Sequence, residues 1–204
     1  MRALIALGQL FVLNMIYLLT VIFSLGLLVG PATSALFCFT TKLIQKRYDN
    51  TQIVKQYLAL VKEKLKYALF LEIITVAIVY LCSVNLDNIL FFNYPVILQK
   101  AIIIVQYIGL IEISLMFLVG SYLHGNYEFK SFKDLLLMSF YIAHRHILTT
   151  IILVASLLLI IYFVFYYLNA ILFILLFSLL ALWVSLLYNP ICKKYVIMRE
   201  NNHE

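Results

Sequence analysis

Six apolar stretches, separated by short polar segments, run along the chain. They cover residues 3–29, 32–44, 67–84, 96–123, 147–168 and 170–188. A membrane-spanning helix needs roughly 17–25 predominantly apolar residues, and every stretch but 32–44 is at least that long. The stretch 32–44 either only just crosses the bilayer or enters and leaves by the same face. The pattern predicts an all-α, polytopic transmembrane helix bundle with about six spans, the second one short, in which residues 1–204 form a single integral membrane domain.

The turn between the first two stretches contains five residues that we expect to pack a helical hairpin: Gly26, Gly30, Pro31, Ala32 and Thr33. Pro31 lacks a backbone N–H and biases Gly30 away from helical geometry. The first helix is therefore expected to end at Gly30 and the second to begin at Pro31. Gly26 and Gly30 also form a small-xxx-small pair, which allows two backbones to approach closely. These residues predict a tight hairpin at a membrane face.

Two polar segments predict amphipathic helices at the cytoplasmic face. Residues 52–66 follow Thr51, a candidate N-cap, and place Lys55, Lys62 and Lys66 along one side. This helix suits either the surface of an anionic leaflet or packing against neighbouring loops.

The second amphipathic helix follows residues 131–134, which resemble a capping box. We expect it to continue without a break into the stretch 147–168. Asn169 is the expected turn before the last stretch, and Asn189 with Pro190 is expected to end that stretch.

Composition and charge agree with a membrane protein. The chain is 65% hydrophobic and 12% charged, with a mean hydropathy of +1.05, which leaves too little polar surface for a water-soluble globule. The net charge of +6 comes from basic clusters between apolar stretches, as the positive-inside rule requires, and no nucleic-acid partner is expected. This rule places both termini in the cytoplasm and the hairpin at the outer face. Lys100 is then the only one of the fifteen Lys and Arg residues outside.

The candidate intramembrane polar site comprises Glu112, Gln106 and Gln99. A carboxyl group deep in an apolar stretch must be neutral or paired, because burying its charge in hydrocarbon costs several kcal/mol. Glu112 is either a coupling carboxylate for transport or a neutral group hydrogen-bonded between helices. Gln99 and Gln106 share one helix face, which indicates a polar seam between this helix and a neighbour. Glu72 is close to a predicted membrane surface and is expected to extend toward it.

No catalytic, cofactor-binding or metal-binding residue is predicted. His124, His144 and His146 cluster near the predicted inner face, but His144 and His146 point to different sides of a helix, which is poor geometry for metal ligands. The three cysteines have no metal-site spacing and are expected to be free thiols. The chain also contains none of the common catalytic motifs, so we expect no enzymatic activity.

The hairpin region resembles a known family. Asn14 in the first stretch, then Gly26-Leu27, and then residues 30–37 running into a helix that ends at Lys42, resemble the bacterial YesL family of integral membrane proteins, a domain of unknown function. The resemblance implies a bacterial plasma-membrane protein connected with oligosaccharide uptake.

Two functions follow as hypotheses. One is a non-catalytic accessory or regulatory component of carbohydrate ABC uptake in the lipid bilayer. Its partner is then either an ABC permease subunit or a second copy of the chain in a homo-oligomer. The alternative is a small-solute transporter or channel in its own right, with Glu112 on the path.

Overall fold

The computed structural model describes residues 2–45, 52–91, 94–167 and 173–201, and these residues form helices and turns without a strand. The helices in chain order are α1 (Arg2–Phe23), α2 (Val29–Ile44), α3 (Ile53–Glu63), α4 (Leu65–Asn88), the short 3-10 helix η1 (Ile89–Phe91), α5 (Val96–Asn126), α6 (Phe132–Arg145), α7 (Ile147–Tyr167) and α8 (Phe173–Asn201). The all-α prediction is confirmed.

Four helices are long and apolar enough to cross a membrane. They are α4, α5, residues 147–164 of α7 and residues 175–195 of α8. The apolar parts of α1 and α2, residues 7–23 and 29–44, are shorter. The structure thus supports a helical membrane protein with four full-length candidate spans, whereas the sequence predicts six.

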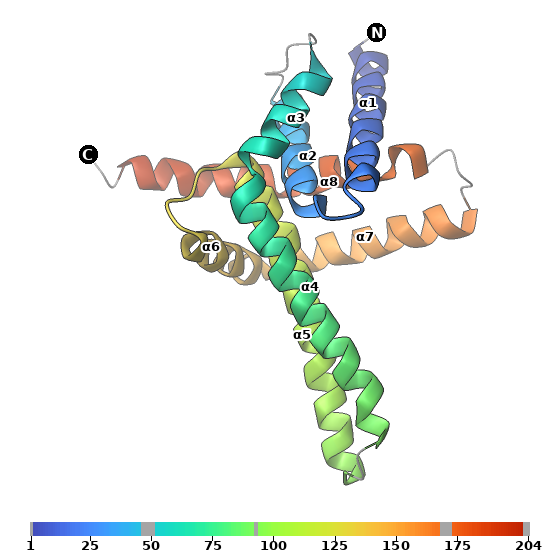
Figure 1. The fold of residues 1–204 in the computed structure, drawn as a ribbon. Coiled ribbons are helices and arrows are strands. Elements are labelled where there is room, and N and C mark those ends of the chain that lie inside the picture. Colours follow the sequence, from blue (N-terminus) through green and yellow to red (C-terminus); the bar gives the residue numbers. More distant parts are fainter. Residues whose placement is uncertain (1, 46–51, 92–93, 168–172, 202–204) are drawn as a thin grey trace.

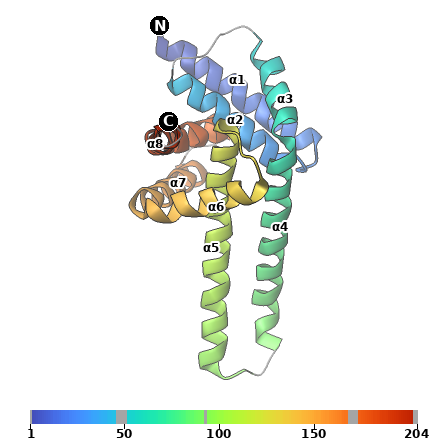
Figure 2. The ribbon, with the colours of Figure 1, turned by 90° about the vertical axis from the view of Figure 1, so that its left-hand side faces the viewer.

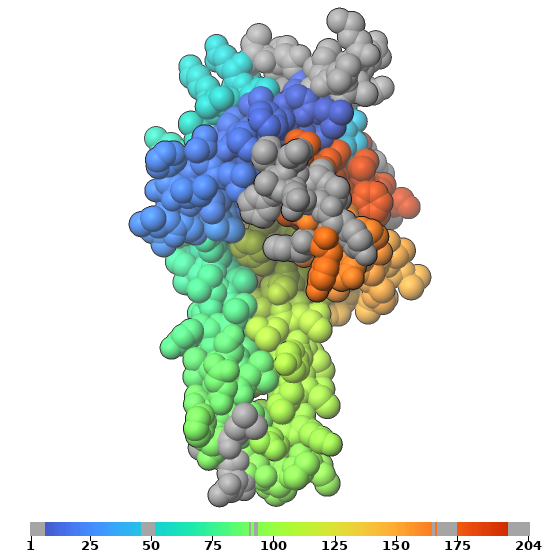
Figure 3. All heavy atoms as spheres, turned by 90° about the vertical axis from the view of Figure 1, so that its right-hand side faces the viewer, coloured from blue at the N-terminus to red at the C-terminus, as the bar shows by residue number. Residues whose placement is uncertain are grey.

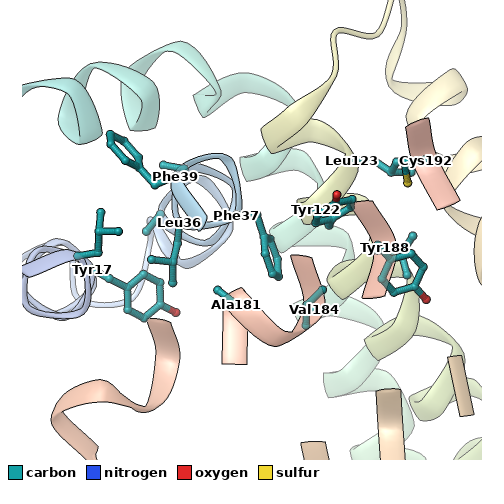
Figure 4. Packing of buried hydrophobic residues seen from close by; sticks show 14 of the residues in the cluster. Tyr17, Leu36, Phe37, Phe39, Tyr122, Leu123, Ala181, Val184, Tyr188 and Cys192 are labelled. Atoms are coloured by element: carbon teal, nitrogen blue, oxygen red, sulfur yellow. The ribbon is translucent and has the colours of Figure 1, made fainter. Parts of the chain in front are cut away.

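Helix α2 lies at the centre of the molecule. It contacts α1, α3, α4, α5 and α8, and most of its 16 residues are buried. Phe37 lies between Tyr122 of α5 and Val184 of α8 (Figure 4), with ring centroids of Phe37 and Tyr122 5.7 Å apart. Small and hydroxyl side chains, among them Gly30, Ala35 and Thr40, let neighbouring helices approach α2 closely, which suits this central position.

Helix α8 is held to the core by polar contacts as well as by packing. The hydroxyl groups of Thr40 and Ser185 lie 2.8 Å apart, and the Asn14 side chain accepts a hydrogen bond from the backbone N–H of Ser178 at 3.0 Å. Polar contacts between helices are the usual substitute for the hydrophobic effect inside a bilayer, where lipid is as apolar as the helix surfaces.

Two helix pairs give the molecule its shape. Helices α4 and α5 form a long hairpin that projects from the other helices, and α7 and α8 run across its base (Figure 1 and Figure 2). Helix α1 lies on the surface above this hairpin (Figure 3). The projecting part of α4 and α5 has only its partner helix to cover it, so most of its apolar side chains are exposed.

Three predicted helix boundaries differ from the structure. Helix α8 continues through Pro190 instead of ending there, because Tyr188 and Cys192 on either side of it are buried in the core. Helices α6 and α7 are separated at His146, where the backbone is not helical and the Thr150 hydroxyl bonds the Ala143 carbonyl. The helix predicted over 52–66 ends at Glu63. The predictions for Thr51 and Asn169 lie outside the described residues.

Candidate functional site

The turn between α1 and α2 lies earlier in the chain than predicted. Helix α1 ends at Phe23 rather than Gly30, and the chain reverses through Leu25 and Gly26, with φ values of 52° and 84°. Gly26 is therefore a turn residue, whereas Gly30 is inside α2, so the two do not form one helix face. Gly26 adopts its left-handed conformation at no steric cost, which allows the chain to leave α1 here, well before Pro31.

The turn exposes apolar side chains, but its backbone N–H groups are hydrogen-bonded. Phe23, Leu25 and Leu27 are 83%, 90% and 71% exposed. The backbone N–H groups of residues 24–26 donate to carbonyls in the last turn of α1, that of Leu27 donates to the Ser24 carbonyl, and that of Leu28 donates to the Ser24 hydroxyl. A backbone polar group at membrane depth needs a partner within the protein, and these N–H groups have one.

Glu72 completes the start of α2. Its carboxylate oxygen Oε2 accepts a hydrogen bond from the backbone N–H of Gly30 at 2.9 Å. The first N–H groups of a helix have no partner within it and carry partial positive charge, so a carboxylate is stabilising there. Glu72 therefore binds a helix end inside the protein instead of extending to the membrane surface, as the sequence had suggested.

Gly30 has a packing role that only glycine can fill. A Cβ atom at this position would lie 2.6 Å from the backbone oxygen of Ala68 and 3.1 Å from Cβ of Glu72. The missing side chain is what lets α2 approach α4 closely enough for Glu72 to reach the Gly30 N–H.

The remaining predicted hairpin residues join α2 to other helices. Pro31 and Ala32 are buried in the first turn of α2. The Tyr57 hydroxyl of α3 donates to the Ala32 carbonyl at 2.8 Å, and the hydroxyl groups of Tyr17 and Thr33 lie 3.4 Å apart. Burial of the Tyr57 phenol in α3 raises its pKa well above the usual value.

The contact between Tyr57 and Ala32 bears on the predicted topology. The sequence placed the hairpin at the outer face and α3 at the inner face. These faces are separated by a hydrocarbon core about 30 Å thick. Since the two residues are in hydrogen-bond contact, the start of α2 and the middle of α3 lie side by side.

Glu112 is paired, and its partner is a histidine. Oε1 of Glu112 lies 3.2 Å from Nε2 of His144, which is in the last turn of α6. The other ring nitrogen, Nδ1, lies 2.9 Å from the carbonyl oxygen of Phe140 one turn earlier. The two side chains are 40% and 39% exposed, so the pair sits at the edge of the α5–α6 contact and is open to its surroundings.

The structure gives the other members of the predicted polar site different surroundings. The Gln99 side chain donates to the Ile89 carbonyl at 3.5 Å, at the far end of the α4–α5 hairpin from His144. Gln106 is half-buried one turn before Gly109, which faces Cys82 of α4. Glu112 and Gln99 thus have separate partners, one on α6 and one at the α4–α5 turn.

The other two histidines of the described residues, His124 and His146, each have a partner of their own. Nε2 of His124 lies 3.0 Å from the Lys64 carbonyl oxygen, and Nε2 of His146 lies 2.8 Å from the Tyr195 hydroxyl. Among the described residues no group of three or more His, Cys, Asp and Glu side chains could hold a metal ion. Cys38, Cys82 and Cys192 are buried free thiols, as expected.

The fold and these sites define the class of the protein: an all-α chain with four helices long and apolar enough to cross a membrane. Residues 10–86, from α1 to near the end of α4, are similar to the family described as "Protein of unknown function, DUF624". No curated protein and no solved structure matches the chain. The similar segment contains the hairpin and Glu72, whereas Glu112 and His144 lie beyond it.

Proposed function

We propose that the chain is a non-catalytic accessory protein of the bacterial plasma membrane that binds a partner membrane protein through the α4–α5 hairpin. The observation that carries this proposal is the exposed apolar surface of the hairpin. The membrane-length segments of α4 and α5 are only 22% and 6% buried within the chain. Such a surface needs either lipid or another transmembrane helix to cover it. The partner that the YesL resemblance implies is an oligosaccharide ABC permease subunit.

The proposed topology has both termini in the cytoplasm and α4, α5, α7 and α8 as crossing helices. The α1–α2 hairpin then enters the bilayer from the cytoplasmic side and returns to it. Its exposed apolar turn and its paired backbone N–H groups support this arrangement. The number of crossings stays even, so the inner location of the basic clusters is unchanged.

Site-specific photo-crosslinking tests the partner proposal. A benzophenone amino acid replaces Ile104, a 58% exposed residue of α5, and a matched control replaces Leu71, which is fully buried in α4. After irradiation of native membranes, we expect an adduct with a sugar-permease subunit from position 104 and none from position 71. Adducts of position 104 with lipid or with a second copy of the chain alone would contradict the accessory role.

Transport by the chain itself is the second candidate, and the Glu112–His144 pair is the observation that favours it. Ionisable groups within apolar helices are typical of ion and substrate pathways. In this case Glu112→Gln abolishes uptake of a labelled oligosaccharide by cells that lack the permease, while the protein still accumulates in the membrane. Glu72→Gln is the matched control, because glutamine can still accept the Gly30 hydrogen bond. No uptake by wild-type protein in these cells would reject this candidate.

A further inference from the structure

The geometry around Glu112 and His144 determines how many protons the two side chains hold. The Phe140 carbonyl oxygen can only accept a hydrogen bond, so a bond at 2.9 Å requires a hydrogen on Nδ1 of His144. If the imidazole is neutral, Nε2 then carries a lone pair. An ionised Glu112 also offers only lone pairs, and two acceptors 3.2 Å apart repel each other.

The other neutral tautomer does not remove this conflict. With its hydrogen on Nε2, His144 can donate to Glu112, but the lone pair on Nδ1 then faces the Phe140 carbonyl. Both contacts coexist only when one more proton is present. That proton is either on the ring, as an imidazolium beside a carboxylate, or on Glu112, as a neutral acid beside a neutral imidazole.

We propose that Glu112 and His144 form a binding site for a single proton, and that the C-terminal end of α6 keeps both contacts of His144, to Glu112 on α5 and to the Phe140 carbonyl within α6, only while the proton is bound. The inference holds for either function proposed above, since it concerns the ligand of the pair and not the partner or cargo of the protein.

The neighbouring charged and titratable groups have other partners. On α6, the Arg145 guanidinium donates to the Tyr141 hydroxyl and lies over the rings of Tyr141 and Tyr195. At the start of α7, His146 bonds the Tyr195 hydroxyl of α8. On α4, residues 73–86 contain no Asp, Glu, Lys, Arg or His, and their titratable groups are Tyr80 and Cys82.

Helix α2 is the third element packed against α5. Its close contact with α5 is at the C-terminal end of α5, where Gly125 meets the backbone of Ser34. Lys42 of α2 lies over the Phe39 ring. The proton of the pair is therefore shared by Glu112 and His144 without a third charged partner among these contacts.

The position of the pair gives proton binding a mechanical consequence. Helix α6 is held on α5 by tight packing of Gly120 against Ser139, where an added Cβ would lie 3.2 Å from the hydroxyl oxygen. The pair closes the contact near the other end of α6, directly before the break at His146 that leads into α7. Loss of the proton removes one of the two contacts that fix the last turn of α6, to Glu112 or to the Phe140 carbonyl, and so loosens the connection to α7.

Distance measurements between spin labels test the inference. Labels are attached at Ile108→Cys on α5 and Leu148→Cys at the start of α7, both exposed positions, in a background whose three native cysteines are replaced by serine. The full chain is studied in lipid nanodiscs between about pH 5 and about pH 8.5, the range in which histidine charge changes. We expect the distance distribution of the wild type to broaden and lengthen as the pH rises.

Two substitutions separate proton binding from a purely structural contact. In Glu112→Gln the amide can donate to a neutral ring or accept from a charged one, so we expect the short distance at every pH. In Glu112→Ala we expect the long distance at every pH, and Lys133→Gln, an exposed position at the other end of α6, should keep the wild-type response. A wild-type distance that does not change with pH, or a Glu112→Gln response equal to that of the wild type, would overturn the inference.

Discussion

Two glycines of this chain lie where helices touch backbone to backbone. A Cβ on Gly30 would lie 2.6 Å from the Ala68 carbonyl oxygen, and one on Gly125 would lie 2.2 Å from the Ser34 carbonyl oxygen. Both contacts involve α2, so the central helix is positioned by close approach at its start and along its side. Neither contact leaves a flexible side chain that could move away, because the opposing atoms are backbone atoms.

The first prediction concerns Gly30→Ala. The added methyl group must push α2 away from α4 and weaken the bond between Gly30 and Glu72, which should lower the stability by about 1–3 kcal/mol. Gly8→Ala is the matched control, because nothing lies within 4 Å of its Cβ position. Thermal unfolding in detergent measures both variants. An equal melting temperature for Gly30→Ala and the wild type would refute the close approach.

The second prediction concerns Tyr127, which follows α5 and whose pKa is raised to about 12 by burial. The folded state holds the phenol proton more tightly than the unfolded state. This stabilisation is complete below about pH 10 and is lost as the pH rises toward about 12. Because solvent screens a half-buried group, we expect an effect of only about 1 kcal/mol.

Melting temperatures between about pH 9 and about pH 11.5 measure this effect, since tyrosine titrates near pH 10. Tyr127→Phe should lose less stability than the wild type over this range. Tyr57 is less suitable for this comparison, because removing its hydroxyl group also deletes the bond to the Ala32 carbonyl. Parallel curves for Tyr127→Phe and the wild type would mean that Tyr127 does not titrate differently on folding.

At the scale of helices, the apolar pattern predicts most elements but not the contacts between them. The stretches 67–84 and 96–123 are parts of α4 and α5, and the Ser131 hydroxyl accepts from the Asp134 N–H at 3.1 Å, as a capping box would. The predicted end of α1 at Gly30 was wrong, because Pro31 lies within the first turn of α2 and does not mark the boundary between the two helices. The start of α2 depends on Glu72, which is distant in sequence.

The sequence indicates one member of the Glu112–His144 pair but not the contact between them. A carboxyl group within an apolar stretch indicates that Glu112 needs a partner, and the structure supplies one. The identity of that partner could not be predicted, because it depends on how α6 folds back along α5 after residues 127–131. The signal in the sequence was the second ionisable group near the end of the following amphipathic helix, which by itself also fits solvation at a membrane surface.

The third prediction tests Glu72 as the cap of α2. Glu72→Ala removes the acceptor of the Gly30 N–H, so amide hydrogen exchange at the start of α2 should become about fivefold faster, which corresponds to about 1 kcal/mol. Glu72→Gln should retain most of the protection. Asp87→Ala, an exposed acidic residue near the end of α4, serves as the control. Exchange that is unchanged in Glu72→Ala would return Glu72 to the surface role expected from the sequence.

At the scale of the whole molecule, the apolar surface exceeds what the chain can cover by itself. The α4–α5 hairpin, α7 and the α1–α2 turn all expose large hydrophobic side chains. Four helices are long and apolar enough to cross a membrane, and the α1–α2 turn is apolar with its backbone N–H groups paired. These features agree if the bilayer covers the turn from the same side that α3 occupies.

The last prediction tests this arrangement by labelling cysteines with a membrane-impermeant maleimide. Position 88 lies at the exposed end of α4 and position 133 on the exposed side of α6. We expect Asn88→Cys to react in intact cells and Lys133→Cys only after permeabilisation.

Leu25→Cys should react in neither condition, because its thiol lies in hydrocarbon, where the reactive thiolate does not form. Labelling after denaturation in detergent controls for the presence of the thiol, and the wild type, whose cysteines are buried, gives the background. Reaction of Leu25→Cys from outside, as for position 88, would mean that α1 and α2 cross the membrane after all. The contact between Tyr57 and Ala32 would then have to lie near the outer face, and α3 with it.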